Sequence, residues 1–350
     1  MKGPPDMITI AVDMMGGDRG TEVSIPGLLL ALSRDSSLRI LAYALPEVVD
    51  ALNDCLPEQD KHRCVCMPVS QSVPMDMSPI QALRRQKDSS MRHAIDAVER
   101  GEASACVSSG NTGALMAMSH YVVGMIAGIA RPAIMANLPT RIAGKSFLML
   151  DLGANVDATA EQLHQFAVMG AYASQALTGH QSPSVALLNI GHEMIKGNEQ
   201  VKLANQRLLD SHLHYKGYIE GHQLMNGDID VVVCDGFVGN IVLKTMEGLV
   251  SNIFQQIKAR CLSQVVYRLF APVLRAMLAP LRKKFKLSSY NGAVLLGLKK
   301  VVVKSHGGTD IEGFAAAINR GKRVAIFDLV NKIEQAIQVS SDVTQAEGAL

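Results

Sequence analysis

Short apolar runs alternate along the chain with longer stretches in which apolar residues recur at helical spacing. Strands are predicted at 8–12, 39–44, 63–67, 105–108, 132–138, 145–150, 184–189, 215–219, 229–234, 293–296 and 301–304. Helices are predicted at about 22–33, 45–53, 78–100, 112–129, 160–177, 200–212, 236–257 and 311–319. Several strands are continuous apolar runs, such as FLML, VALL and VVVC, which is typical of strands buried on both faces. The alternation predicts an α/β protein whose mostly parallel sheet is covered by helices on both sides.

Glycine, asparagine, aspartate and lysine gather where these strands end. The runs are DMMGGD, SSGNTGA, DLGANVD, GHEMIKGNE, DGFVGN and SHGGTD. In open α/β sheets, ligands bind in the crevice outside the carboxyl ends of the strands. Six loops of similar chemistry at equivalent places therefore predict a functional crevice at that edge.

Composition narrows the class of protein. The 350 residues are 48% hydrophobic and 19% charged, with no tryptophan, so the core must be aliphatic and rich in methionine. With no repeat and no evident linker, we expect one α/β/α domain over residues 8–340. The six cysteines form no C-x-x-C pair, and the first residues do not form a signal peptide. We expect a soluble protein of the reducing cytoplasm, without a metal site.

One segment is strongly basic. No Asp or Glu occurs between Glu247 and Asp310, and apolar residues in this gap recur at helical spacing, interrupted by two prolines. Residues 250–288 are predicted to form a basic amphipathic helical excursion that contacts a membrane surface or an acidic protein. Packing at a dimer interface is the alternative, and nothing indicates nucleic-acid binding. The residues predicted to make this contact are Arg268, Leu269, Phe270, Arg275, Leu278, Lys283 and Lys284.

The strand-end loops also carry a resemblance to a known family. The runs VDMMGGD (12–18), SSGNTGALMA (108–117), LDLGANVD (150–157), LLNIGHEMIKGNE (187–199), DVVVCDGFVGNIVLKTMEG (230–248) and HGGTDIEGF (306–314) closely resemble the bacterial phosphate acyltransferases of phospholipid synthesis, the PlsX family. The resemblance implies a three-layer, Rossmann-like α/β/α fold related to phosphotransacetylases and isopropylmalate dehydrogenases. It also implies a homodimer, no cofactor, and reversible transfer of a long-chain acyl group from acyl carrier protein to inorganic phosphate. Met194 departs from the family pattern, which has a second acid after Glu193.

This reaction requires no nucleophilic side chain and no dedicated base from the protein. A thioester is already activated, its leaving thiol has a pKa of about 8.5, and phosphate is itself nucleophilic. The protein has only to hold the reactants together and stabilise the developing oxyanion. The residues predicted to act in the chemistry are Lys196, Lys244, Asn240, Asp235 and His306, with His306 protonating the departing thiolate. The alternatives are ordinary surface positions for the two lysines and an ordinary loop position for His306.

The residues predicted to bind substrate lie in the same loops. They are Ser109, Gly110, Asn111, Thr112, Gly113, Asp13, Gly16, Gly17, Asp151, Asn155, Asn189, Gly236 and Gly239. In SSGNTGA, glycine backbone and a helix N-terminus suit an anion. Helix capping by Asn111 or Thr112 is the alternative, as are turn and capping roles for the other asparagines. The aspartates are expected to orient lysines or amides, since direct contact would repel phosphate.

Two other functions remain open from the sequence. One is a short-chain phosphotransacetylase that uses acyl-CoA, and the other is a non-catalytic protein that binds lipid or carrier protein. A dehydrogenase is disfavoured, because the chain has no G-x-G-x-x-G fingerprint.

Overall fold

The computed structural model describes residues 7–263, 273, 276–280 and 291–347. Within these residues, eleven strands form one sheet in the order β3-β2-β1-β4-β11-β10-β5-β6-β9-β7-β8. The strands are β1 (Ile8–Asp13), β2 (Leu38–Ala44), β3 (Cys64–Pro68), β4 (Ala105–Ser108), β5 (Ala133–Pro139), β6 (Ser146–Leu150), β7 (Val185–Asn189), β8 (Tyr215–Glu220), β9 (Val231–Val233), β10 (Ala293–Leu296) and β11 (Val301–Lys304).

The sheet consists of two parallel blocks joined by an antiparallel centre. Strands β3, β2, β1, β4 and β11 pair in parallel, as do β6, β9, β7 and β8. Between the blocks, β10 runs antiparallel to both β11 and β5, and β5 runs antiparallel to β6. The predicted α/β class with a mostly parallel sheet is confirmed. The reversed strands were not predicted, because an apolar run carries no signal for strand direction.

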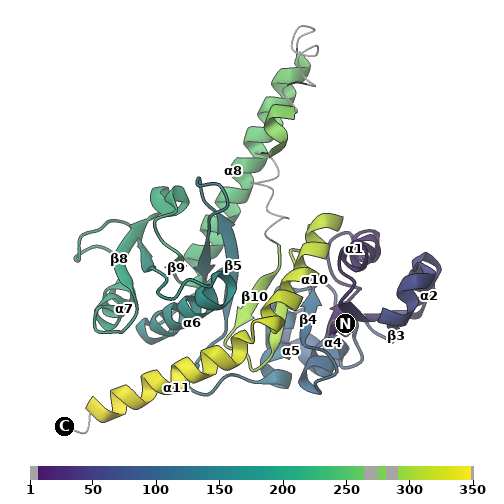
Figure 1. Cartoon of the computed structure of the whole chain (residues 1–350), viewed down its shortest axis with the longest axis horizontal. Helices are drawn as coiled ribbons and strands as arrows, with labels where there is room; N and C mark the ends of the chain where they lie inside the picture. The colour runs from purple at the N-terminus through teal and green to yellow at the C-terminus, as the bar shows by residue number, and fades with distance from the viewer. Residues whose placement is uncertain (1–6, 264–272, 274–275, 281–290, 348–350) are drawn as a thin grey trace, which may run out of the picture.

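Helices cover both faces of the sheet (Figure 1). They are α1 (Thr21–Arg34), α2 (Pro46–Cys55), α3 (Pro79–Arg85), α4 (Ser90–Glu99), α5 (Thr112–Val123), α6 (Ala160–Thr178), α7 (Glu199–Leu209), α8 (Gly236–Ser263), α10 (Ile311–Ile326) and α11 (Leu329–Glu347), with 3₁₀ helices at Glu58–Arg63 and Gly221–Asn226. Alternate strand residues face opposite layers: Val231 and Val233 join a core with α6 residues, whereas Val232 joins one that α8 residues pack against. This alternation is the physical basis of the three-layer arrangement.

Two predicted helices differ from the structure. The stretch 78–100 forms two helices, because the hydroxyl of Ser89 accepts a hydrogen bond from Arg92 N (3.3 Å) and starts α4 anew. Asp88, just before this cap, is held by Ser70. The last predicted helix, α10, continues seven residues beyond its predicted end, to Ile326, and α11 after it was not predicted.

Helix α8 projects away from the body of the sheet (Figure 1). Among the residues predicted to contact a membrane or acidic partner, Leu278 is partly buried. The others, Arg268, Leu269, Phe270, Arg275, Lys283 and Lys284, lie outside the described residues. In the helices that the structure describes, none combines the length and the apolar character needed to cross a bilayer.

Candidate active site

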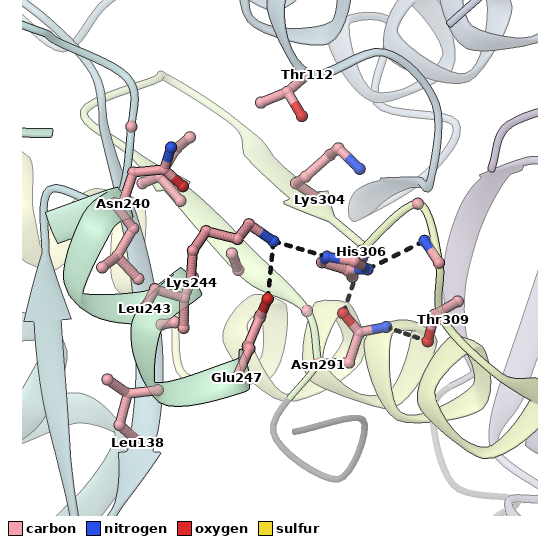
Figure 2. A pocket seen from close by; sticks show the side chains of 18 of the residues that line it. Thr112, Leu138, Asn240, Leu243, Lys244, Glu247, Asn291, Lys304, His306 and Thr309 are labelled. Atoms are coloured by element: carbon pink, nitrogen blue, oxygen red, sulfur yellow. Dashed lines mark hydrogen bonds and ion pairs between the residues drawn. The ribbon is translucent and has the colours of Figure 1, made fainter. Parts of the chain in front are cut away.

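A pocket of 610 Å³ opens beside the antiparallel centre of the sheet (Figure 2). Its walls come from β5, from the loops that follow β4, β6 and β11, from the chain before β10, and from the first turns of α8. The lining residues are Met75, Thr112, Ile134, Ala136, Leu138, Leu152, Gly153, Asn240, Leu243, Lys244, Glu247, Asn291, Gly292, Ala293, Lys304, His306, Gly307, Gly308, Thr309 and Asp310. The predicted crevice at the strand ends thus corresponds to a cavity between the two parallel blocks.

Three polar residues stand in register where β1, β4 and β11 end. Ser108 is paired with Asp13 on one side and with Lys304 on the other. Residues paired in this way point to the same side of a sheet. Buried Asp13 accepts hydrogen bonds from the hydroxyls of Ser108 (2.6 Å) and Ser90 (2.6 Å). Burial raises the pKa of Asp13, and these hydrogen bonds oppose the shift.

Lys304 brings a buried amine to the pocket. Its side chain is 9% exposed, and Nζ donates hydrogen bonds to the carbonyl oxygens of Ser109 (3.2 Å) and Ser305. Burial lowers the pKa of Lys304 to about 8, while the charges of Asp13 and Asp18 act in the opposite direction. Lys304 was not among the predicted site residues. The signal that could have found it is the lysine that ends the apolar strand VVVK.

Lys244 and His306 meet inside the pocket, with Lys304 nearby (Figure 2). Lys244 Nζ lies 2.8 Å from the carboxylate of Glu247 and 2.9 Å from His306 Nε2. Burial, reinforced by the charge of Lys244, lowers the pKa of His306. In the neutral ring, Nδ1 accepts a hydrogen bond from Gly308 N (3.0 Å), which leaves the ring proton on Nε2. An ammonium group has three N–H donors, so Lys244 can donate to an anionic oxygen in the pocket as well as to Glu247.

Asn291 holds the loop that carries His306. Its Oδ1 accepts a hydrogen bond from His306 N (2.9 Å), and its Nδ2 donates to the hydroxyls of Ser305 (2.7 Å) and Thr309 (3.0 Å). Sequence patterns do not indicate this residue, because its partners are more than ten positions away.

The glycines near the start of the chain serve close packing between loops. A Cβ on Gly16 would lie 2.3 Å from Gly110 N, and Gly17 has a positive φ of 97°. Asp18 N donates to Gly307 O (2.9 Å), so the loop after β1 touches the loops after both β4 and β11. Of the predicted substrate-binding residues, Gly16, Gly17 and Gly110 therefore shape the pocket without lining it.

Asn111 and Thr112 have different surroundings. Asn111 Oδ1 accepts from Ala114 N (3.0 Å), and its Nδ2 donates to the carbonyls of Met75 and Met77 (2.8 Å each). Its side chain therefore caps α5 and ties down a neighbouring loop. Thr112 lines the pocket, whereas Gly113 packs closely on Pro79, where a Cβ would lie 2.7 Å from Cγ.

A second set of predicted residues packs against the first turn of α8 and holds it in place. Asp151 is fully buried and accepts hydrogen bonds from Ile134 N (2.9 Å), Asn155 N (2.7 Å) and Asn155 Nδ2 (2.9 Å). A Cβ on Gly236 would lie 2.7 Å from the Asp151 carboxylate, and one on Gly239 would lie 1.9 Å from its carbonyl oxygen.

The first turns of α8 direct Asn240 and Lys244 into the pocket. Asp235, directly before the helix, accepts from Val238 N (2.9 Å) and acts as its cap. About one and two turns further on, Asn240 and Lys244 line the pocket (Figure 2). Asp151, Asn155, Asp235 and the two glycines thus position α8.

The loop after β7 lies apart from the pocket. Asn189 donates to the carbonyls of Gly191 and Lys196 (3.2 Å each) and so holds its own loop. Lys196 is exposed and is not among the lining residues. The structure therefore does not bring Lys196 together with Lys244, and its predicted catalytic role stays a prediction.

One wall of the pocket is apolar. Ile134, Ala136 and Leu138 contribute from β5, and Leu152 and Leu243 flank them. Two lysines and a histidine thus face an aliphatic wall across a single cavity. Such a cavity can hold an anion next to an apolar chain.

Comparison with known proteins identifies the family. The family model described as "Fatty acid synthesis protein" matches residues 8–332. The chain is 48% identical to a phosphate acyltransferase of Alkalilimnicola ehrlichii, with 89% of this chain and 91% of the relative covered. It is 44% identical to a phosphate acyltransferase of Bordetella petrii, with 97% and 96% covered.

Solved structures share the fold at low sequence identity. A phosphotransacetylase from Streptococcus pyogenes aligns with a TM-score of 0.58 at 16% identity, covering 95% of both chains. A branched-chain phosphotransacylase from Enterococcus faecalis aligns with a TM-score of 0.54 at 15% identity, covering 91% of this chain and 99% of its own. These structures show the fold, whereas the family-model match and the relatives at 44–48% identity show that the chain belongs to the phosphate acyltransferase family.

Proposed function

We propose that this phosphate acyltransferase takes its long-chain acyl group from the thioester of acyl carrier protein. A phosphate oxygen attacks the thioester carbonyl carbon, the C–S bond breaks, and the products are acyl phosphate and the free carrier thiol. The observation that carries the proposal is the pocket in which Lys244, Lys304 and His306 face an aliphatic wall. The lining side chains that the structure describes include no serine or cysteine, which fits direct attack by phosphate.

The reacting groups have natural places in this pocket. The carbonyl oxygen, which gains negative charge during attack, would be stabilised by Lys244 and by the amide of Asn240. His306 Nε2–H would donate a hydrogen bond to the departing thiolate, and the proton that the free thiol gains is the one that HPO₄²⁻ loses as it becomes acyl phosphate. Glu247 holds Lys244 through the 2.8 Å contact. The acyl chain would lie along the β5 wall.

The assignment of the donor rests on the segment that follows the site. Helix α8 lines the pocket at its start and then leaves the body of the protein (Figure 1), leading into the basic segment 250–288. Acyl carrier protein is acidic, so the basic sequence of this segment offers complementary charge. We further propose that the enzyme is a cytoplasmic homodimer that touches the membrane only peripherally.

A comparison of acyl donors tests this assignment. Purified protein is given phosphate with the same long acyl chain on either acyl carrier protein or coenzyme A, and acyl phosphate is quantified by trapping with hydroxylamine. We expect kcat/KM to be about 10-fold or more higher for the carrier-protein thioester, because its protein surface adds electrostatic contacts.

The control donor is acetyl-CoA, which has no long chain for the aliphatic wall. Equal or better use of acetyl-CoA would refute the proposed donor and favour a short-chain phosphotransacetylase.

A further inference from the structure

Lys304 is a buried cation whose role in the reaction is still unassigned. An ammonium group has three N–H donors, and two of those on Lys304 are directed at the carbonyls of Ser109 and Ser305. The carboxylate of its cross-strand neighbour Asp13 is occupied by Ser108, Ser90 and the N–H of Met15. Among the described residues, no carboxylate forms an ion pair with Lys304, so its remaining donor and its positive charge are available to the pocket that it lines.

The surroundings of this amine suit a small oxyanion. Lys304 is the last residue of β11, and Ser109, whose carbonyl it contacts, lies in the loop that leads into α5. The N-terminus of α5 adds partial positive charge. The hydroxyl-bearing side chain of Thr112, in the first turn of α5, lines the pocket with Lys304 (Figure 2).

We propose that Lys304 binds the attacking phosphate, together with Thr112 and the N-terminus of α5. This inference rests on the proposed function, because phosphate is the nucleophile of that reaction. It gives the two lysines of the pocket different roles. Lys304 binds the nucleophile, and Lys244 and His306 interact with the thioester. The proposal also places phosphate beside the SSGNTGA loop, which follows β4. The positive charge that binds it then comes from Lys304 on the neighbouring strand β11.

Burial makes the charge of Lys304 depend on pH near neutrality. The groups facing it are Asp13 on β1, Asp18 in the following loop, Lys244 on α8 and His306 in its own loop. The two aspartates favour the charged amine, but burial dominates and lowers its pKa to about 8. Lys304 is therefore protonated below that pH and loses its charge above it. Anion binding should be strong on the acid side and should weaken as pH rises through about 8.

Sulfate is the probe that isolates this titration. Unlike phosphate, it keeps two negative charges throughout the neutral range, so a change in its affinity with pH reports on the protein alone. Calorimetry with the full chain measures its Kd from about pH 7 to about pH 9 in the absence of any acyl donor. We expect the wild-type Kd to rise about 10-fold over this range, and Lys304→Met to weaken binding about 10- to 100-fold at the acid end.

Two further variants sharpen the result. Lys300→Met removes an exposed lysine just before β11 and should bind sulfate as the wild type does. Lys304→Arg keeps a charge that does not titrate in this range, so its Kd should stay level from about pH 7 to about pH 9. In kinetic assays, Lys304→Met should raise KM for phosphate much more than KM for the acyl donor.

The outcomes separate this inference from the proposed function. A wild-type Kd for sulfate that is level across this pH range overturns the inference, even if Lys304→Met does not fold. Sulfate binding to folded Lys304→Met with wild-type affinity overturns it as well. Failure of the wild type to use any thioester would instead overturn the proposed function, because the calorimetric experiment contains no thioester.

Discussion

Asn111 forms its hydrogen bonds within the protein. It caps α5 and holds the carbonyls of Met75 and Met77, so all of its side-chain partners are backbone groups. Thr112, the next residue, faces the pocket that Asn111 helps to shape. These two neighbouring residues therefore have different roles: Asn111 stabilises the loop, and Thr112 faces the ligand-binding pocket.

Substitution distinguishes these two roles. Asn111→Ala loses the cap and the bonds to the 74–77 loop, so we expect the free energy of unfolding to fall by about 1–2 kcal/mol. Thr112→Val keeps the shape of the side chain but loses the hydroxyl, so it should raise KM for phosphate several-fold with little effect on stability. Urea unfolding and steady-state kinetics measure the two effects. The assignment fails if Asn111→Ala unfolds like the wild type while its KM for phosphate rises.

For single residues, the sequence patterns predicted correctly which loops surround the pocket. They did not predict which partners the side chains in these loops contact. Asp13, Asn155, Asn189 and Asp235 are polar residues at strand ends, as a ligand site requires, yet each bonds to the protein's own backbone or side chains. Capping and ligand binding select the same residue types, so composition cannot separate them. Lys304 was missed for the opposite reason, because a lysine at a strand end looks like any surface lysine until its burial is known.

Helix α8 depends on an unusually close approach at its first turn. The helix begins against the Asp151 turn, and Gly239 leaves no room there for a side chain. Because Asn240 and Lys244 follow directly, any displacement of this turn moves both out of the pocket. The backbone packing at the first turn of α8 therefore determines where Asn240 and Lys244 lie in the pocket.

Two glycines of α8 form a matched pair for a test. A Cβ on Gly239 would lie 1.9 Å from a backbone oxygen, whereas one on Gly248 would meet nothing within 4 Å. We expect Gly239→Ala to destabilise the protein by about 3 kcal/mol or more and to reduce activity. Gly248→Ala should stabilise it by about 0.5–1 kcal/mol, since alanine favours a helix. Equal melting temperatures for the two variants would contradict this description.

The sequence predicted most elements because their apolar periodicities are strong. It joined α3 and α4 into one helix, since the periodicity continues on both sides of the Ser89 cap. It also could not show that β10 and β5 run against their neighbours. That reversal brings the two parallel blocks together around the pocket, so the position of the cavity could not be deduced from the order of elements alone.

At the scale of the molecule, the pocket joins the two blocks of the sheet. The block of β1, β4 and β11 supplies Thr112, Lys304 and His306. Helix α8, which follows β9 of the other block, supplies Asn240 and Lys244, and β5 between the blocks supplies most of the aliphatic wall. Neither block alone contains both the anion-binding groups and the apolar wall. The proposed reaction, between an anion and an acyl chain, takes place where the two meet.

Detection of both products from one reaction tests this account most directly. Purified protein is mixed with long-chain acyl carrier protein, with and without inorganic phosphate, while free thiol and acyl phosphate are measured together. We predict that thiol appears only when phosphate is present, and that one acyl phosphate forms for each thiol released. Thiol release at the same rate without phosphate, or no release in either mixture, would contradict direct transfer of the acyl group to phosphate.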